Sequence, residues 1–345
     1  MGTAMTEINS KRIVQTAPEQ RYTLLEDAEG RYATVTGAQT VSYTDTVSDH
    51  SLWLPGDTSE TWRSLARPDL QLRVNAARLT PRRGPHATMT SLSEQLRASG
   101  WVCLPAILSC EVVRRLRERA QARPGEVDHH IVATSLAAAR ASAEPVSLAL
   151  VQSYLGNVAM RFAHPPALVD LPPDDGIRAV QGWHCDYPYL WGSPSPVQEQ
   201  VPVAASGLVL GVQRTICISG FRRANGATVF RLDWRNQPPP GRVWGWWSAY
   251  AREGARARRG MPHAGPDTQV IEAPAGSILI YDARIWHRQG VNLTDTSRPA
   301  ILQSVTPRFI APFIPTHRAA RAMADAQPLA ALTKREHMAL SALMT

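Results

Sequence analysis

Apolar residues in the middle of the chain follow helical spacing, and further on they form short alternating runs. Helical spacing predicts a helix over residues 91–98, which Gly100 ends. Residues 101–105 form a short apolar run typical of a strand. Ser109 is a suitable N-cap for a second helix over residues 111–122. This part of the chain is therefore predicted to be helix, strand, helix.

One or two more helices are predicted over the alanine- and leucine-rich residues 130–156. Short β-branched or alternating runs, separated by Pro, Gly and Asn, then predict strands over 161–164, 207–221, 227–232, 269–273, 277–281 and 300–309. Many short strands after a helical start favour a barrel or sandwich supported by helices. We assign this mainly β domain with flanking helices (α+β) to residues 91–315.

The remaining segments are predicted to lie outside this domain core. Residues 1–90 are polar and rich in turns, and we interpret them as an N-terminal extension with one alternating stretch at 32–36 and a linker at 79–85. The long Trp-rich connection over 234–268 is interpreted as a functional insert. Leucines at helical spacing in the tail, residues 316–345, predict helices that either cap the barrel or dimerise.

Composition narrows the class of protein. The hydrophobic fraction of 44% and the 10 tryptophans indicate a globular protein. No apolar run is long enough for a membrane span, and the first 20 residues lack the apolar core of a secretory signal, so a cytoplasmic location is expected. The net charge is +8, and nearly all of the basic residues are arginine. This composition does not by itself imply nucleic-acid binding. The 4 cysteines lack CxxC spacing, so reduced thiols are expected.

Candidate chemistry centres on two histidines and one aspartate. His184 and Asp186 are two residues apart, and on a strand they share a face. His287 comes at the end of a later strand run. Two imidazoles and one carboxylate form the facial set that holds non-haem Fe(II) and leaves positions open for a co-substrate and oxygen. Cys185, between the first two, should point away from the metal.

Arg298 strengthens this interpretation. It stands at the start of the strand run that follows His287, where its guanidinium could enter the same cavity. A guanidinium binds the remote carboxylate of a dicarboxylic acid through a bidentate fork. The alternative is a surface arginine at a strand edge.

With these residues in order, the sequence resembles the phytanoyl-CoA dioxygenase family of Fe(II)/2-oxoglutarate oxygenases. The likeness covers about residues 92–309 and rests on four motifs: 100–109, Trp183-His184-Cys185-Asp186, Asn225-Gly226-Ala227-Thr228, and 276–298. The fold that this resemblance implies is a double-stranded β-helix, or jelly roll, with helices packed on its major sheet. The usual Pro-Gly-Ser-His after the Asn-Gly turn is replaced here by Phe230-Arg231-Leu232-Asp233-Trp234.

The resemblance also implies roles for individual residues. It makes His184, Asp186 and His287 the iron ligands and Arg298 the anchor of 2-oxoglutarate, with O2 as the other co-substrate. Gln289 stands where family members carry a co-substrate contact. Cofactor-binding candidates on strands expected to face the cavity are Thr228 and Gln213, each of which could instead make core hydrogen bonds.

The predicted reaction is hydroxylation, or another oxidation, of an unactivated C–H bond in a small organic molecule, with release of succinate and CO2. Because Asp186 fills the third ligand position, halogenation is disfavoured. The Trp-rich insert suggests a bulky substrate from specialised metabolism. No nucleic-acid or membrane partner is expected, and the chain is predicted to be a monomer or homodimer. Alternatives are a nucleic-acid- or protein-modifying dioxygenase on the same scaffold, and a non-catalytic jelly-roll binding module.

Overall fold

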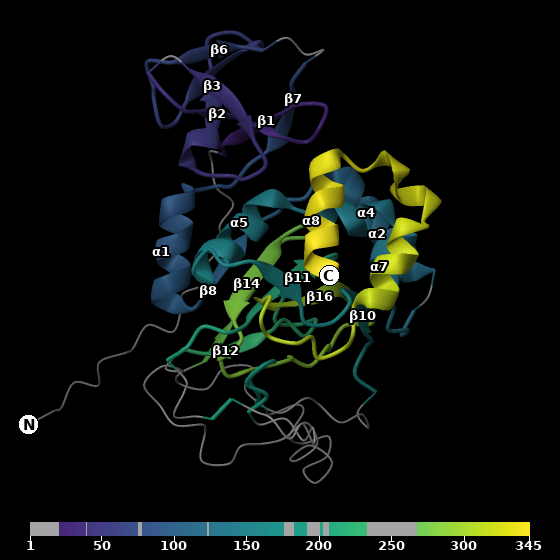
Figure 1. The fold of residues 1–345 in the computed structure, drawn as a ribbon. Helices are drawn as coiled ribbons and strands as arrows, with labels where there is room; N and C mark the ends of the chain where they lie inside the picture. Colours follow the sequence, from purple (N-terminus) through teal and green to yellow (C-terminus); the bar gives the residue numbers. More distant parts are fainter. Residues whose placement is uncertain are drawn as a thin grey trace, which may run out of the picture.

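A computed structural model describes most of the chain and shows two units joined by a common core (Figure 1). The described residues are 21–38, 40–74, 78–122, 124–175, 183–191, 201–202, 207–232 and 268–345. The predicted insert at 234–268 lies outside the described residues, apart from Thr268.

Within the first 90 residues the chain forms an antiparallel sheet. Its strands are β1 (Thr23–Glu26), β2 (Tyr32–Val35), β3 (Val41–Thr44), β4 (Trp53–Pro55), β5 (Thr61–Ser64), β6 (Gln71–Arg73) and β7 (Thr80–Arg83), in the order β3-β2-β1-β4-β5-β6 with β7 paired to β1. A 3-10 helix, η1 (Asp49–Ser51), precedes β4. The predicted alternating stretch is present as β2. The segment predicted as a linker instead contains β7, because its backbone completes the edge of β1 in a register that pairs Leu25 with Pro81.

The predicted helix–strand–helix segment is confirmed. Helix α1 (Met89–Ser99) ends at Gly100, whose φ of +81° is a left-handed conformation that favours glycine. Strand β8 (Trp101–Leu104) follows, and the Ser109 hydroxyl then accepts a hydrogen bond from the Val112 amide at 3.3 Å to cap helix α2 (Cys110–Gln121).

Further helices complete one side of the domain. These are α3 (Ile131–Thr134), α4 (Leu136–Ser142), α5 (Pro145–Tyr154), α7 (His317–Ala324), the 3-10 helix η3 (Gln327–Ala331) and α8 (Lys334–Met344). The tail leucines Leu329, Leu332, Leu340 and Leu343 are buried in the same core as α4 and α5. Of the two sequence alternatives for the tail, the structure shows the capping arrangement.

The strands of the second unit form two sheets that share one barrel. The larger sheet contains β8, β9 (Met160–Phe162), β10 (Ala167–Leu171), β11 (Val212–Cys217), β14 (Ile278–Asp282) and β16 (Arg298–Pro307), with the order β10-β16-β11-β14-β8 and β9 beside β16. The smaller sheet contains β12 (Val229–Arg231), β13 (Thr268–Val270) and β15 (His287–Arg288), with β12 in the middle. From β11 to β16 the chain passes back and forth between the sheets, with β12 and β13 together in the smaller one, and the strand pairings are antiparallel. This is the predicted double-stranded β-helix.

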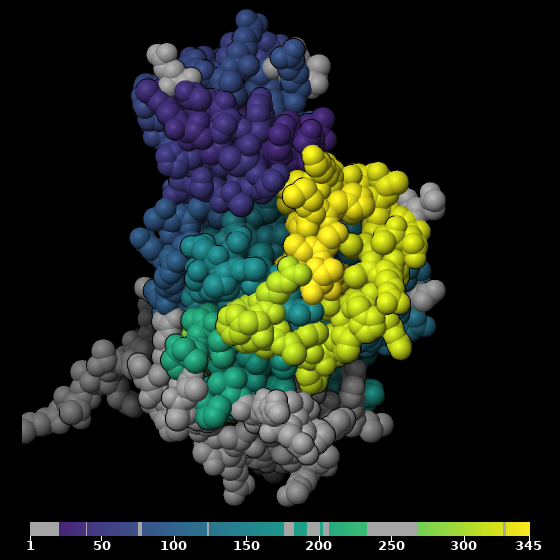
Figure 2. Space-filling model, in the orientation of Figure 1, coloured from purple at the N-terminus to yellow at the C-terminus, as the bar shows by residue number. Residues whose placement is uncertain are grey.

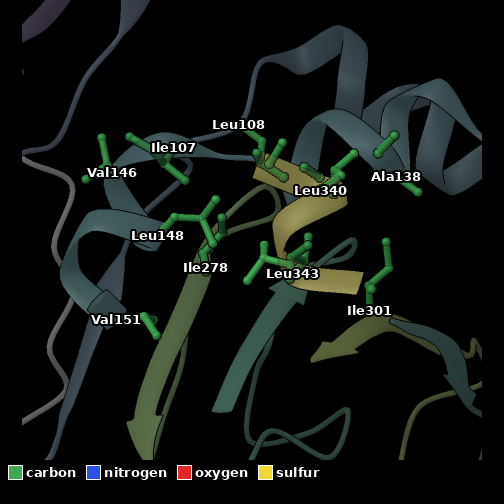
Figure 3. Packing of buried hydrophobic residues seen from close by; sticks show 14 of the residues in the cluster. Ile107, Leu108, Ala138, Val146, Leu148, Val151, Ile278, Ile301, Leu340 and Leu343 are labelled. Carbon is green, nitrogen blue, oxygen red and sulfur yellow. The ribbon is translucent and has the colours of Figure 1, made fainter. Parts of the chain in front are cut away.

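Alternation along the strands gives the large sheet two different faces. Ile278 and Ile301 point outward and pack with Leu148 of α5 and with Leu340 and Leu343 of α8 (Figure 3). Leu279 and Tyr281, one residue along from Ile278 and Ile280, point inward and pack against Phe230 of the small sheet. The helices thus cover one face, and the inner face is left to line the barrel.

Candidate metal centre

His184, Asp186 and His287 meet at one point of the barrel. Their ligand atoms all lie within 4.8 Å of one another, although His287 is far from the other two in sequence. The Asp186 carboxylate is 3.7 Å from His184 Nε2 and 3.2 Å from His287 Nε2. The two imidazole rings are buried, with centroids 4.4 Å apart. Among the described residues this is the one group of three or more His, Cys, Asp or Glu side chains with such spacing.

His184 and Asp186 are held by a bridge and a turn, not by the regular strand expected from the sequence. His184 and His287 form an isolated β-bridge, with reciprocal backbone hydrogen bonds of 3.1 and 3.0 Å. The Asp186 carbonyl then accepts bonds from the Tyr189 and Leu190 amides, which turns the chain. The two side chains still converge, and the Cys185 thiol between them points elsewhere and donates to the Arg284 carbonyl. The prediction that Cys185 is turned from the metal position agrees with this contact.

The His287 imidazole and the Asp186 carboxylate shift the pKa of each other. Burial opposes charge on both, but the Asp186 carboxylate raises the pKa of His287, and the imidazolium in turn lowers the pKa of Asp186. His287 Nδ1 lies 2.9 Å from the Ile285 carbonyl, so one ring proton belongs on Nδ1. In the imidazolium the second proton is on Nε2 and faces the Asp186 carboxylate. A bound metal ion would replace the Nε2 proton and leave the Nδ1 proton on the Ile285 carbonyl, which is the tautomer that a metal ligand needs.

The donor set fits a divalent transition metal. Two neutral imidazole nitrogens and one carboxylate oxygen on a single side are the ligands that non-haem Fe(II) sites use. The Asp186 side chain remains 23% exposed, so the site is reachable from outside.

Arg298 is a buried cation that forms no ion pair within 4 Å in the described part of the chain, where the Asp170 carboxylate acts on it only from farther away. It is 7% exposed, and its guanidinium carbon lies 4.0 Å from the centroid of the Phe221 ring. Its Nε has no hydrogen-bond partner among the described residues. Burial lowers the pKa of Arg298 to about 10, because the charged form loses hydration. A buried guanidinium is stable when an anion pairs with it, and this one has donors left for a carboxylate.

Arg298 lies on the face of β16 that lines the barrel. It begins β16, two residues before Ala300, which packs with Cys217 and Phe221 inside the barrel. The guanidinium is therefore placed on the inner face of the large sheet.

Three weaker candidates occupy different positions on the two sheets. Gln213 of β11 is buried and donates to the Ser304 hydroxyl at 3.0 Å, so it has a core hydrogen bond. Thr228 and Gln289 are half-buried and flank β12 and β15. Continuing the register of Val229 with Arg288 by one pair places Thr228 opposite Gln289. Both therefore belong to the small sheet next to His287.

Tyr281 belongs to the site, although the sequence analysis did not single it out. Its hydroxyl lies 3.4 Å from both Asp186 Oδ2 and His287 Nε2. Burial raises the pKa of Tyr281 well above its usual value, and Asp186 adds to the shift, so the phenol stays protonated. The available signal was strand parity, because Tyr281 is on the same face of its strand as inward-facing Leu279.

Comparisons with known proteins identify no family for the chain. No protein-family model and no curated protein matches it. The resemblance to phytanoyl-CoA dioxygenases therefore stays a prediction. None of the described helices is sufficiently long and apolar to cross a membrane.

Several solved structures are similar to part of this chain. The epimerase SnoN in complex with Fe3+, alpha ketoglutarate and nogalamycin RO is 18% identical, with 63% of this chain and 83% of that chain covered and a TM-score of 0.44. HygX from Streptomyces hygroscopicus with iron bound is 16% identical, with 64% and 88% covered and a TM-score of 0.48. HygX with nickel, 2-oxoglutarate and hygromycin B has a TM-score of 0.47 at the same identity and coverage.

Proposed function

We propose that this chain is an Fe(II)/2-oxoglutarate-dependent oxygenase that hydroxylates, or otherwise oxidises, an unactivated C–H bond of a small organic molecule. The observation that carries the proposal is the convergence of His184, Asp186 and His287 inside a double-stranded β-helix. The buried Arg298, which forms no ion pair among the described residues, gives independent support.

Each residue has a defined task in this proposal. His184 and His287 supply imidazole nitrogens, and Asp186 supplies a carboxylate oxygen that offsets part of the metal charge. Arg298 holds the remote carboxylate of 2-oxoglutarate through paired N–H donors. Gln289, Thr228 and Gln213 are proposed as further co-substrate contacts. Iron with 2-oxoglutarate and O2 supplies the oxidant, and succinate and CO2 are released.

Tyr281 is proposed to fix the carboxylate. Its hydroxyl is placed to donate to Asp186 Oδ2, which leaves the other carboxylate oxygen for the metal. Because Asp186 occupies the third ligand position, we propose hydroxylation as the default outcome, and we propose a substrate from specialised metabolism.

Anaerobic addition of Fe(II) and then 2-oxoglutarate tests the proposal. The wild-type protein should develop a weak visible charge-transfer absorption, and His184→Ala should not, because one of the three protein ligands is lost. His50→Ala is the matched control, since His50 is exposed on the N-terminal unit and should leave the absorption intact. If the wild-type protein gave no absorption without oxygen and released no succinate after O2 was admitted, the chain would not be an oxygenase.

A further inference from the structure

A short turn between β14 and β15, residues 283–285, has three consecutive backbone carbonyls that contact Asp186, Cys185 and His287. The Ala283 carbonyl accepts a hydrogen bond from the Asp186 amide at 2.8 Å. The Arg284 carbonyl accepts from the Cys185 thiol at 3.0 Å. The Ile285 carbonyl lies 2.9 Å from His287 Nδ1. The position of this turn therefore determines where Asp186 and His287 point.

Asp282 holds the turn from its N-terminal end. The Asp282 side chain is fully buried, and its Oδ1 accepts from the Arg284 backbone amide and from Arg284 Nε, both at 2.8 Å. Its Oδ2 accepts from Arg284 Nη2 and from the Tyr154 hydroxyl, the latter at 2.6 Å. A buried carboxylate that receives this many donors is rigid, because moving it would leave charge and donors without partners.

Tyr154 links this carboxylate to the helical layer. It is the last residue of α5, which packs on the outer face of the large sheet, whereas the metal-binding side chains lie on the inner side. The Asp282 side chain is thus outside the barrel. The turn that it holds connects it to Asp186 and His287 on the inside.

Resting on the proposed function, we infer that Asp282, with Arg284 and Tyr154, is a positioning residue that orients the metal ligands Asp186 and His287 through the carbonyls of the 283–285 turn. It touches neither the ligand atoms nor the co-substrate position assigned to Arg298. Groups that orient ligands in this way commonly change metal affinity by about 10- to 100-fold when they are removed. A loose turn would let the His287 ring rotate and the Asp186 carboxylate withdraw.

The chain offers a matched control for a purely structural role. Ser147 is also on α5, and its buried hydroxyl accepts from Arg214 Nη2 at 2.6 Å in a separate polar cluster with Gln303 and Ser142. Ser147→Ala and Tyr154→Phe each remove one hydroxyl from the same helix. Only the hydroxyl of Tyr154 reaches the carboxylate that holds the turn.

Titration of the apo-protein with Co(II), followed by its visible spectrum and by competition with a chromogenic chelator, measures metal affinity apart from turnover. Asp282→Asn should weaken binding about 10- to 100-fold and change the spectrum, because the amide nitrogen cannot accept the hydrogen bonds that one carboxylate oxygen accepts. Tyr154→Phe should weaken binding about three- to tenfold, the value of one hydrogen bond. Ser147→Ala should bind as the wild-type protein does, even if its melting temperature falls.

The outcomes separate this inference from the proposed function. Equal Co(II) affinity in the wild type, Asp282→Asn and Tyr154→Phe would overturn the positioning role alone. If Tyr154→Phe and Ser147→Ala weakened Co(II) binding equally, the cause would be a general loss of stability. That result would also overturn the positioning role. If Asp282→Asn does not fold, the comparison of Co(II) affinity between Tyr154→Phe and Ser147→Ala tests the positioning role. A wild-type protein that binds no Co(II) would overturn both proposals.

Discussion

The role proposed for Arg298 allows co-substrate binding to be tested separately from metal binding. It lies on the barrel face of β16, and its Nε has no hydrogen-bond partner among the described residues. Arg298→Lys keeps the charge but loses the planar fork, so we expect the KM for 2-oxoglutarate to rise about 10- to 100-fold. The Co(II) affinity of this variant should stay within about twofold of the wild type, because no protein ligand is removed.

Arg223→Ala is the control for that measurement, since its side chain is exposed on the turn before β12. It should leave both the KM and the metal affinity unchanged. If Arg298→Lys changed neither quantity, another cation would hold the co-substrate.

The reactivity of the four cysteine thiols measures how well each of them is buried. Burial raises the pKa of Cys103 to about 12 and raises the pKa of Cys185 and Cys217 well above the usual range, whereas Cys110 is exposed. Because the thiolate is the reactive form, a raised pKa leaves little of it at pH 8. We expect one thiol of the native protein to react rapidly with a chromogenic disulfide reagent, and all to react after denaturation.

Cys110→Ser should abolish the rapid phase in this assay. A second rapid thiol in that variant would show that the barrel opens readily to solvent.

At the level of single residues, the sequence predicted the side chains with chemically distinctive spacing and missed the ones that support them. His184, Asp186 and His287 were identifiable because imidazoles and a carboxylate in this order match a known ligand set. Tyr281 and Asp282 are ordinary strand residues in the sequence. Their roles depend on which face of β14 meets the barrel and which meets α5, and that follows only from tertiary packing.

At the level of elements, prediction succeeded where a local signal was strong. The Ser109 cap and the Gly100 stop located two helix ends, because capping is a contact between near neighbours in sequence. Strand limits were less accurate. The run 207–221 was predicted as one strand, but β11 covers only Val212–Cys217, since its partner β14 is short and pairs with it only over Val212–Ile216.

The N-terminal sheet was harder to predict because its strands are short and largely polar. Strand β7 has the sequence Thr80-Pro81-Arg82-Arg83 and all four of its side chains are exposed, so no hydrophobic pattern reveals it. Its place is determined by backbone pairing with β1, which lies far away in the sequence. A single alternating stretch at β2 was the only part with a readable pattern.

Across the whole molecule, one core joins the N-terminal sheet to the helical layer. Leu24, Tyr32, Val47 and Leu52 of the N-terminal unit pack in the same cluster as Leu92 and Leu340 of the helices. In the space-filling view the purple N-terminal unit lies directly against the yellow C-terminal helix (Figure 2). We therefore expect the two units to unfold together.

Arg335 of α8 is the residue on which this coupling can be tested. It is 6% exposed, its guanidinium carbon lies 5.5 Å from the centroid of the Tyr32 ring, and its Nη1 donates to the Ala143 carbonyl at 3.1 Å. Its backbone amide also donates to the Glu29 carbonyl at 3.0 Å. Arg335→Ala should lower the free energy of unfolding by about 2–4 kcal/mol, because it removes buried packing and leaves the carbonyl unpaired.

Urea denaturation and hydrogen exchange measure that effect, with Lys334→Ala as the neighbouring control. Lys334 is 70% exposed and pairs with Glu29 at 3.7 Å on the surface, so its removal should cost less than about 1 kcal/mol. In Arg335→Ala the amides of β1 and β2 should exchange faster than those of β11 and β16, because the shared contact is lost and the sheet can open separately. Unchanged exchange in β1 and β2 would show that the apolar side chains alone couple the two units.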